Sequence, residues 1–165
     1  MNLDRALALA VRAHAGQKDQ AGQPYILHPL RVMMKTDTAA GRIVAVLHDV
    51  VEDTALTLAD LRAAGLAARA VDAVDALTRR PGEPYLEYMA RAGANPLARR
   101  IKIADLEDNM GWRRLKGLAA DDRARMARYR RAYRLLTGTE FCGARPPNAR
   151  ALNTPRTRRR RRASR

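Results

Sequence analysis

A histidine and three carboxylates stand close together in one short segment of the chain. His48, Asp49, Glu52 and Asp53 fall within residues 43–53, where most other residues are aliphatic. Drawn as a helix with His48 at 0°, the segment places Glu52 at about 40°, Asp49 at about 100° and Asp53 at about 140°, opposite an apolar stripe. Carboxylates this close repel one another unless a cation or a reaction stabilises their charge. The segment therefore predicts a divalent metal site with an acid–base pair beside it.

Three residues outside this segment could belong to the same site. His28 precedes a proline at the expected start of a helix, and Asp105 lies in an otherwise apolar helical run. A carboxylate in such a run needs a partner, because isolated buried charge is costly. Taken alone, His28 could instead be a helix cap or a core histidine, and Asp105 could pair with Lys102 or Arg99. His14 could orient a ligand or be a helix-end histidine favoured by the helix dipole.

Two imidazoles and two carboxylates make up the candidate ligand set: His28, His48, Asp49 and Asp105. A structural zinc site would usually use cysteines, and none lies near these residues. The mixed set suits a six-coordinate ion such as Mn²⁺ or Fe²⁺, with positions left for water and substrate. Such an ion would acidify its water and polarise a phosphoryl oxygen. Glu52 and Asp53 would then orient and deprotonate the attacking water.

The elements that position these residues are predicted to be helices. Apolar residues make up 47% of the chain and aromatics only 4%, a composition that favours helices over strands. We expect Tyr25 and Trp112 to be packing residues rather than to stack on bases. The pattern predicts an all-α bundle of seven or eight helices over residues 1–138. The expected helices run from about residue 3 to near Gly16, from Pro29, over Ile43–Asp53, Leu58–Ala64 (with Thr57 as N-cap), Ala67–Thr78, Tyr85–Arg91, from Pro96 through Asp105, and over Asp121–Leu136.

Residues 139–165 differ sharply from the rest of the chain. They hold nine arginines and one acid, and thus supply +8 of the net charge of +15. So polar a segment cannot bury enough surface to offset its ordering entropy, and we predict that it is a disordered tail. The tail could bind nucleic acid weakly and nonspecifically through phosphates, or it could be an extension without function.

The chain's setting is predicted from its cysteine content and its hydrophobic pattern. Cys142 is the single cysteine, so no internal disulfide can form. No signal peptide is recognisable, and no apolar run approaches the ~20 residues that span a bilayer. We expect a cytoplasmic protein that does not associate with membranes.

Three blocks of sequence carry a resemblance to a known family. They are Gly-Gln-Pro-Tyr-Ile-Leu-His-Pro at 22–29, Leu-His-Asp-Val-Val-Glu-Asp-Thr at 47–54 and Lys-Ile-Ala-Asp-Leu-Glu-Asp-Asn at 102–109. In order and spacing they resemble the HD superfamily of metal-dependent phosphohydrolases. Within it, the match is to the hydrolase domain of the RelA/SpoT alarmone enzymes and their small single-domain relatives. The blocks span nearly all of residues 1–138, which we predict to be one HD-type helical bundle.

The resemblance implies a role for each candidate residue. The four ligands named above would bind a metal, usually Mn²⁺, and Glu52 and Asp53 would position the nucleophilic water. Asn109 would line the nucleotide site, Lys18 lies in a loop that supplies basic contacts, and Tyr129 would place its ring near the base. The implied reaction removes the 3′-pyrophosphate of ppGpp or pppGpp to give GDP or GTP and pyrophosphate. We expect no synthetase domain after the bundle, where only the basic tail follows.

Asp19 departs from the family pattern. Many relatives have an arginine in the loop before Gly-x-Pro-Tyr, where this chain has Gln17-Lys18-Asp19-Gln20. An acid facing a polyphosphate is unfavourable unless it points away or holds a second cation. Asp19 therefore keeps open the hydrolysis of another nucleotide, such as a dNMP or NADPH. A separate alternative is a non-catalytic nucleic-acid-binding or regulatory module.

Overall fold

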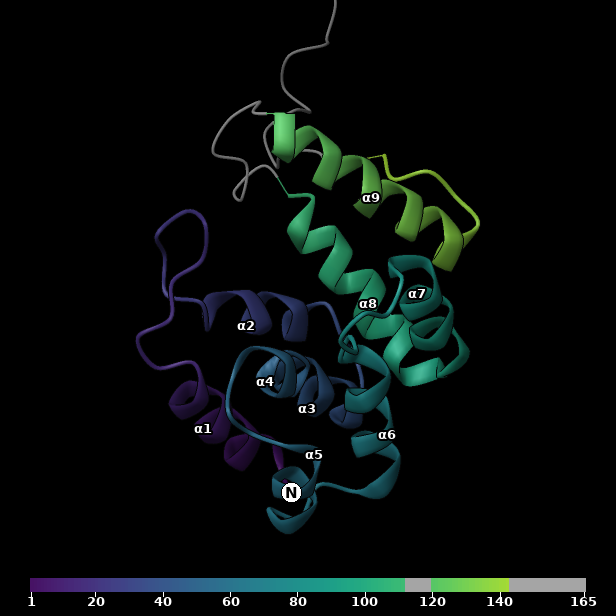
Figure 1. The fold of residues 1–165 in the computed structure, drawn as a ribbon. Coiled ribbons are helices and arrows are strands. Elements are labelled where there is room, and N and C mark those ends of the chain that lie inside the picture. Colours follow the sequence, from purple (N-terminus) through teal and green to yellow (C-terminus); the bar gives the residue numbers. More distant parts are fainter. Residues whose placement is uncertain (112–119, 143–165) are drawn as a thin grey trace, which may run out of the picture.

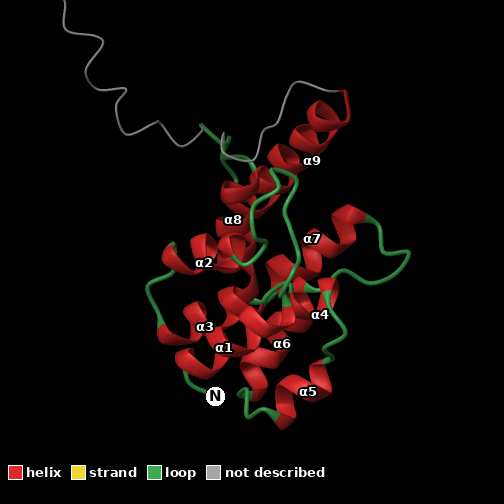
Figure 2. Cartoon of the chain, turned by 90° about the vertical axis from the view of Figure 1, so that its left-hand side faces the viewer, coloured by secondary structure: helices red, strands yellow, loops and turns green. Residues whose placement is uncertain are grey.

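The computed structural model describes residues 1–111 and 120–142, and the regular structure of this part is helical (Figures 1 and 2). Its helices are α1 (Leu3–Ala13), α2 (Leu27–Met34), α3 (Ala39–Leu47), α4 (Val50–Asp53), α5 (Leu58–Ala63), α6 (Ala68–Leu77), α7 (Tyr85–Ala94), α8 (Pro96–Asn109) and α9 (Ala120–Thr137). An isolated bridge joins Lys18 to Pro24 across the loop between α1 and α2. The predicted all-α bundle is confirmed.

Polar side chains cap the starts of two helices, and one of them, Thr57, is the N-cap that the sequence predicts. The Thr57 hydroxyl accepts the Asp60 N–H, and the Asp60 carboxylate accepts the Thr57 N–H, which forms a capping box at the start of α5. At α8, the Asn95 side chain accepts the N–H groups of residues 97 and 98, and Pro96 occupies the first helical position. These caps fix where α5 and α8 begin.

Helix α3 lies at the centre of the bundle and packs against α1, α2, α6 and α8 (Figure 1). Residues 44–47 of α3 have no exposed surface. A second apolar cluster joins α7, α8 and α9 around Tyr88, Met89 and Leu106. Helix α8 contributes to both clusters, because Ile101 belongs to the first and Leu106 to the second. The helix that carries Asp105 is thus packed into the core on two sides.

The prediction of one continuous helix over 43–53 is wrong. Helix α3 ends at Leu47, α4 begins at Val50, and His48 and Asp49 lie between them. Asp49 has φ −101° and ψ −6°, and the buried His48 ring bonds back to the Ala45 carbonyl at 2.7 Å. Such a local side-chain bond competes with the regular helical pattern. The described residues therefore form nine helices, since one predicted helix is divided in two.

Several predictions concern residues outside the described part of the chain. Trp112 lies there, as do residues 143–165 with the arginine-rich run. The division into a domain over 1–138 and a disordered tail therefore stays a prediction. Among the described residues, no helix has both the length and the apolar content needed to cross a bilayer.

Candidate active site

The two histidines of the candidate ligand set are buried, and each has one ring nitrogen already bonded. His28 stands near the start of α2 and His48 just after α3, with 2% and 1% of their surface exposed. The His48 Nδ1 lies 2.7 Å from the Ala45 carbonyl oxygen, and the His28 Nδ1 lies 2.8 Å from Asp108 Oδ2. Both partners are acceptors, so Nδ1 carries the proton in each ring. Each Nε2 is therefore available as a metal ligand.

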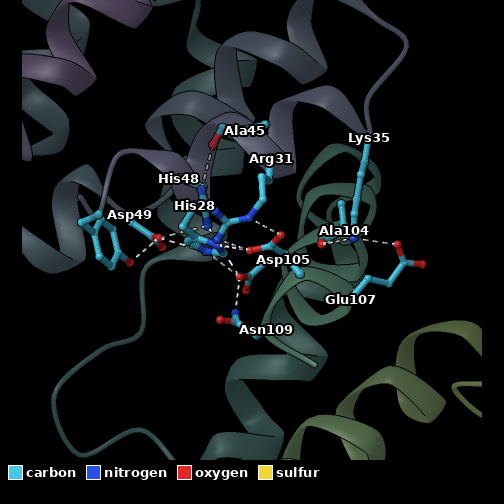
Figure 3. A network of polar contacts seen from close by, with 12 residues as sticks. His28, Arg31, Lys35, Ala45, His48, Asp49, Ala104, Asp105, Glu107 and Asn109 are labelled. Atoms are coloured by element: carbon cyan, nitrogen blue, oxygen red, sulfur yellow. Dashed lines mark hydrogen bonds and ion pairs between the residues drawn. The ribbon is translucent and has the colours of Figure 1, made fainter. Parts of the chain in front are cut away.

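The two carboxylates of the candidate ligand set lie beside these Nε2 atoms (Figure 3). Asp49 Oδ2 is 3.1 Å from the Nε2 of His48 and 3.6 Å from that of His28. Asp105 Oδ1 is 3.1 Å from the Nε2 of His28 and 3.8 Å from that of His48. All four side chains point toward one another in Figure 3, although they come from α2, the α3–α4 junction and α8.

The geometry fits a divalent cation. Ligand atoms of His28, His48 and Asp49 lie within 4.8 Å of one another. Asp105 is not in this mutually close group of described residues, but its Oδ1 approaches both histidines. The Nε2 of His48 is buried and makes no hydrogen bond in the described structure, although Asp49 Oδ2 lies 3.1 Å away. Since buried polar atoms are almost always paired, this orphan atom indicates a ligand. Imidazole nitrogens with carboxylate oxygens suit a first-row transition metal.

Lys102 explains how Asp105 is kept ionised within the core. Its Nζ lies 2.8 Å from Asp105 Oδ2 and 5.0 Å from the centre of the Tyr88 ring. Burial alone would raise the pKa of Asp105, but the Lys102 ammonium and the two histidines hold it well below its usual value. One Asp105 oxygen thus makes the predicted pair with Lys102, and the other faces the histidines, as a ligand role would require.

Asp108 is a further carboxylate on α8 that belongs to the site, although it was not among the residues predicted from the sequence. It bonds the Nδ1 of His28 at 2.8 Å and is itself bound by the Arg31 guanidinium at 2.7 and 3.0 Å. Burial disfavours protonation of His28, but hydrogen bonds to Asp105 and Asp108 outweigh it and raise the pKa of His28 to about 9. Asp108 lies three residues after Asp105 in a helix, so this spacing could have identified it.

Glu52 and Asp53 stand on the one-turn helix α4, and both side chains are exposed. The Glu52 carboxylate accepts the Arg79 N–H at 3.0 Å, and Asp53 Oδ2 lies 2.8 Å from the Tyr25 hydroxyl. Desolvation raises the pKa of both acids, and the charges of neighbouring carboxylates raise it further. Each acid is therefore a better proton acceptor than an ordinary surface carboxylate.

Tyr25 joins the acid pair to the ligand set, a role that the sequence analysis did not predict. Its hydroxyl lies 2.7 Å from Asp49 Oδ2 and 2.8 Å from Asp53 Oδ2. The ring packs on His14, with centroids 4.9 Å apart. His14 in turn bonds Gln17 at 2.8 Å, and Gln17 bonds the Asp53 carbonyl at 2.8 Å. His14 thus supports the residues around Asp53 and does more than end α1.

The predicted substrate-binding residues surround this centre. Asn109 donates a hydrogen bond to Asp105 Oδ1, so it lies at the ligand cluster. Lys18 is exposed in the loop between α1 and α2, and α9 reaches this loop through a hydrogen bond from Arg125 to Gln20. Tyr129 packs against the second apolar cluster. Their roles toward a nucleotide stay predictions.

Asp19 is directed at its own loop. Its Oδ1 accepts the N–H groups of Ala21 and Gln23 at 2.8 and 2.9 Å. An aspartate that bonds backbone N–H groups two and four residues ahead stabilises a tight turn. The carboxylate is therefore bound within its own turn and need not face a polyphosphate. Asp19 thus gives no reason to exclude a polyphosphate substrate.

Comparisons with known proteins agree with this architecture. The chain is 34% identical over 121 residues to "GTP pyrophosphokinase" of Streptomyces coelicolor (66% of this chain, 14% of the relative). It is 33% identical over 141 residues to "Bifunctional (p)ppGpp synthase/hydrolase SpoT" of Escherichia coli (76% of this chain, 20% of the relative). No family model matches the chain.

A solved structure described as a metazoan ortholog of SpoT that hydrolyzes ppGpp superposes with a TM-score of 0.66. The two proteins are 24% identical, and the match covers 84% of this chain and 86% of the other. The chain spans no more than a fifth of the curated relatives just described. The resemblance predicted from the sequence is confirmed: in sequence and in fold, the chain is an HD-type, RelA/SpoT hydrolase-like protein.

Proposed function

We propose that the protein is a metal-dependent phosphohydrolase that removes the 3′-pyrophosphate of ppGpp or pppGpp, which yields GDP or GTP and pyrophosphate. One observation carries the proposal: two histidine Nε2 atoms, Asp49 and Asp105 converge beside a pair of exposed carboxylates. The choice of substrate rests on the names of the relatives. "Guanosine-3′,5′-bis(diphosphate) 3′-pyrophosphohydrolase" of Aquifex aeolicus, for example, is 29% identical over 119 residues.

His28, His48, Asp49 and Asp105 would hold the metal, and Mn²⁺ is the ion that we propose. When bound, such an ion lowers the pKa of a coordinated water and polarises a phosphoryl oxygen. The Nδ1 partners of both histidines fix the ring orientation that this requires.

Glu52 and Asp53 would orient the attacking water and accept its proton. Their exposure lets water reach them, and their raised pKa makes the transfer more favourable. Tyr25 would keep Asp53 beside Asp49 through its hydroxyl. Lys18, Asn109 and Tyr129 would contact the nucleotide, and we place the reaction in the cytoplasm.

The alternatives are less well supported. Hydrolysis of a dNMP or NADPH was kept open by Asp19, whose carboxylate is taken up by its own turn. A non-catalytic nucleic-acid-binding module would not need a complete ligand set. Nucleic acid binding by the arginine-rich tail is a separate hypothesis about residues outside the described part.

The test is release of pyrophosphate from ppGpp by the purified full chain, with Mn²⁺ and with EDTA. The proposal expects release that depends on Mn²⁺ and stops with the chelator. Stoichiometric Mn²⁺ binding without release would contradict the substrate, and a dNMP and NADPH would then be assayed. Absence of both binding and release would contradict the enzyme itself.

A further inference from the structure

We infer that the loop between α6 and α7, residues 78–84, positions Glu52 through a single backbone N–H group, and that Arg91 is the positioning residue that holds this loop. The inference rests on the proposed role of Glu52.

The contact between the loop and the acid is one hydrogen bond. Glu52 Oε2 accepts the Arg79 N–H at 3.0 Å. Within the described part of the chain, no second hydrogen bond reaches the Glu52 carboxylate. Glu52 is exposed and stands on a helix of only four residues, so its own helix restrains it little. The orientation of its carboxylate therefore depends on where the loop presents this N–H.

Arg91 on α7 holds the loop through four hydrogen bonds. Its Nε and Nη2 donate to the two Glu83 oxygens at 2.8 and 2.7 Å. Its Nη1 donates to the Asp75 carbonyl at 2.7 Å, and Nη2 also donates to the Thr78 carbonyl at 2.8 Å. The side chains are 22% exposed for Arg91 and 12% for Glu83. Paired bonds between a guanidinium and a carboxylate are strong and geometrically specific, so Arg91 ties both ends of the loop to one point.

Glu83 then closes the loop around Arg79. Its carboxylate accepts the Arg80 N–H at 3.0 Å, and its carbonyl accepts the Arg79 guanidinium at 3.1 and 2.8 Å. Gly82 has φ +74°, a left-handed conformation that glycine adopts at little cost. Because the Arg79 side chain and the following residue are both fixed, the direction of the Arg79 N–H is fixed as well.

The experiment compares Arg91→Met and Arg91→Lys with the wild-type full chain. Residue-resolved amide exchange by NMR measures the loop, and pyrophosphate release from ppGpp with Mn²⁺ gives kcat and KM. For Arg91→Met we expect faster exchange of the Arg79 amide and a kcat that is about 10- to 100-fold lower, since small misplacements of catalytic groups cost this much. KM and Mn²⁺ affinity should stay within about twofold, because the ligands are untouched. Arg91→Lys keeps the charge but loses the fork, so its kcat should fall between the two.

Arg80→Met is the matched control. It removes one arginine from the same loop, but within the described structure the Arg80 side chain makes only a 3.6 Å contact with Asp75, with exposures of 61% and 43%. Its backbone bond to Glu83 is kept. Amide exchange and kcat should match the wild type.

Two results would overturn the inference. One is faster Arg79 exchange with unchanged kcat in Arg91→Met, and the other is unchanged exchange in that variant. Wild-type protein that releases no pyrophosphate would instead refute the proposed function. In that case the hydrogen bond between the Arg79 N–H and Glu52 is tested with Glu52→Ala. Faster exchange of the Arg79 amide in this variant would support the hydrogen bond, and unchanged exchange would refute it. If Arg91→Met lacks the helical circular dichroism of the wild type, Glu83→Gln takes its place with the same expectations.

Discussion

The proposed metal-ligand side of the site (His28, His48, Asp49 and Asp105) and its proposed acid side (Glu52 and Asp53) meet at Asp49, and they are built in opposite ways. On the ligand side, His28 and His48 are almost fully buried, and each ring is oriented by a second partner. On the acid side, Glu52 and Asp53 are exposed on a one-turn helix, and among the described residues each carboxylate has one hydrogen-bond partner. The ligands are thus fixed by the core, whereas the acids are fixed from outside by a loop and by Tyr25.

This difference follows from what each side must do. A buried imidazole needs partners for both nitrogens, because unpaired buried polar atoms are costly, and pairing also fixes the ligand geometry. A proton acceptor must instead exchange with water, so it must stay near solvent. The four predictions below test this division, from the largest expected effect to the smallest.

Replacing a proposed ligand should abolish both metal binding and pyrophosphate release. We expect Asp49→Ala to abolish stoichiometric Mn²⁺ binding, measured by titration calorimetry, and to reduce pyrophosphate release to background, because the residue stands where the two sides meet. Asp60→Ala removes an exposed helix-capping aspartate and should leave metal binding intact. Stoichiometric binding by Asp49→Ala would show that the ligand set is wrongly assigned.

Replacing an acid should affect only the chemistry. Glu52→Gln keeps the shape of the side chain but loses the proton acceptor, so we expect kcat to fall by about 10²- to 10⁴-fold while Mn²⁺ affinity is kept. Steady-state assays together with calorimetry separate the two effects. A near-normal kcat would mean that Glu52 does not accept the proton, and the acid side would then depend on Asp53.

Removing the hydrogen-bond partner of a proposed ligand should weaken metal binding without abolishing it. Asp108→Asn takes a charged partner from His28, and we expect Mn²⁺ affinity to fall by about 10- to 100-fold. Glu107→Gln is the neighbouring control, because Glu107 belongs to a half-exposed pair with Lys35 at 3.2 Å. Equal affinities for the two variants would argue that core packing alone orients His28.

The smallest effect should be a pH dependence of stability in metal-free protein. The pKa of His28 is raised to about 9 from an unfolded value near 6.5, so its stabilising contribution is complete below pH ~6.5 and is lost as pH rises through ~9. With EDTA, we expect Tm to fall by a few degrees over this range. With Mn²⁺ the fall should be absent, since the metal binds the neutral ring. His28→Gln in EDTA should flatten the slope, and an unchanged slope would assign it to another group.

Much of the fold and of the ligand side was predictable, because it depends on local pattern. Helical periodicity and capping residues gave most helices, and residue chemistry gave the two histidines and two aspartates that the structure brings together. The interruption of the helix at His48 and Asp49 was not predictable from periodicity, since a helical wheel assumes one continuous helix. On a regular helix these neighbours would diverge by about 100°, and the break lets both face one point.

The supports of the site were harder to predict because they join residues far apart in the sequence. His28 and Asp108 are 80 positions apart, and Glu52 and Arg79 are 27 apart. Nothing in the local pattern of Arg91 distinguishes it from the many solvated arginines of a basic chain. Such contacts depend on how α2, α7 and α8 pack, which periodicity alone does not specify.

The position of Lys102 has a consequence for the order in which the protein folds and binds its metal. It supplies a permanent internal cation beside Asp105, and its own positive charge is kept because that carboxylate raises its pKa although burial opposes this. The negative charge of Asp105 is therefore balanced from the moment the helices pack. We expect the chain to mature in two stages, with folding complete before any ion arrives. Its abundance would then be independent of metal supply, and only the active fraction would vary with it.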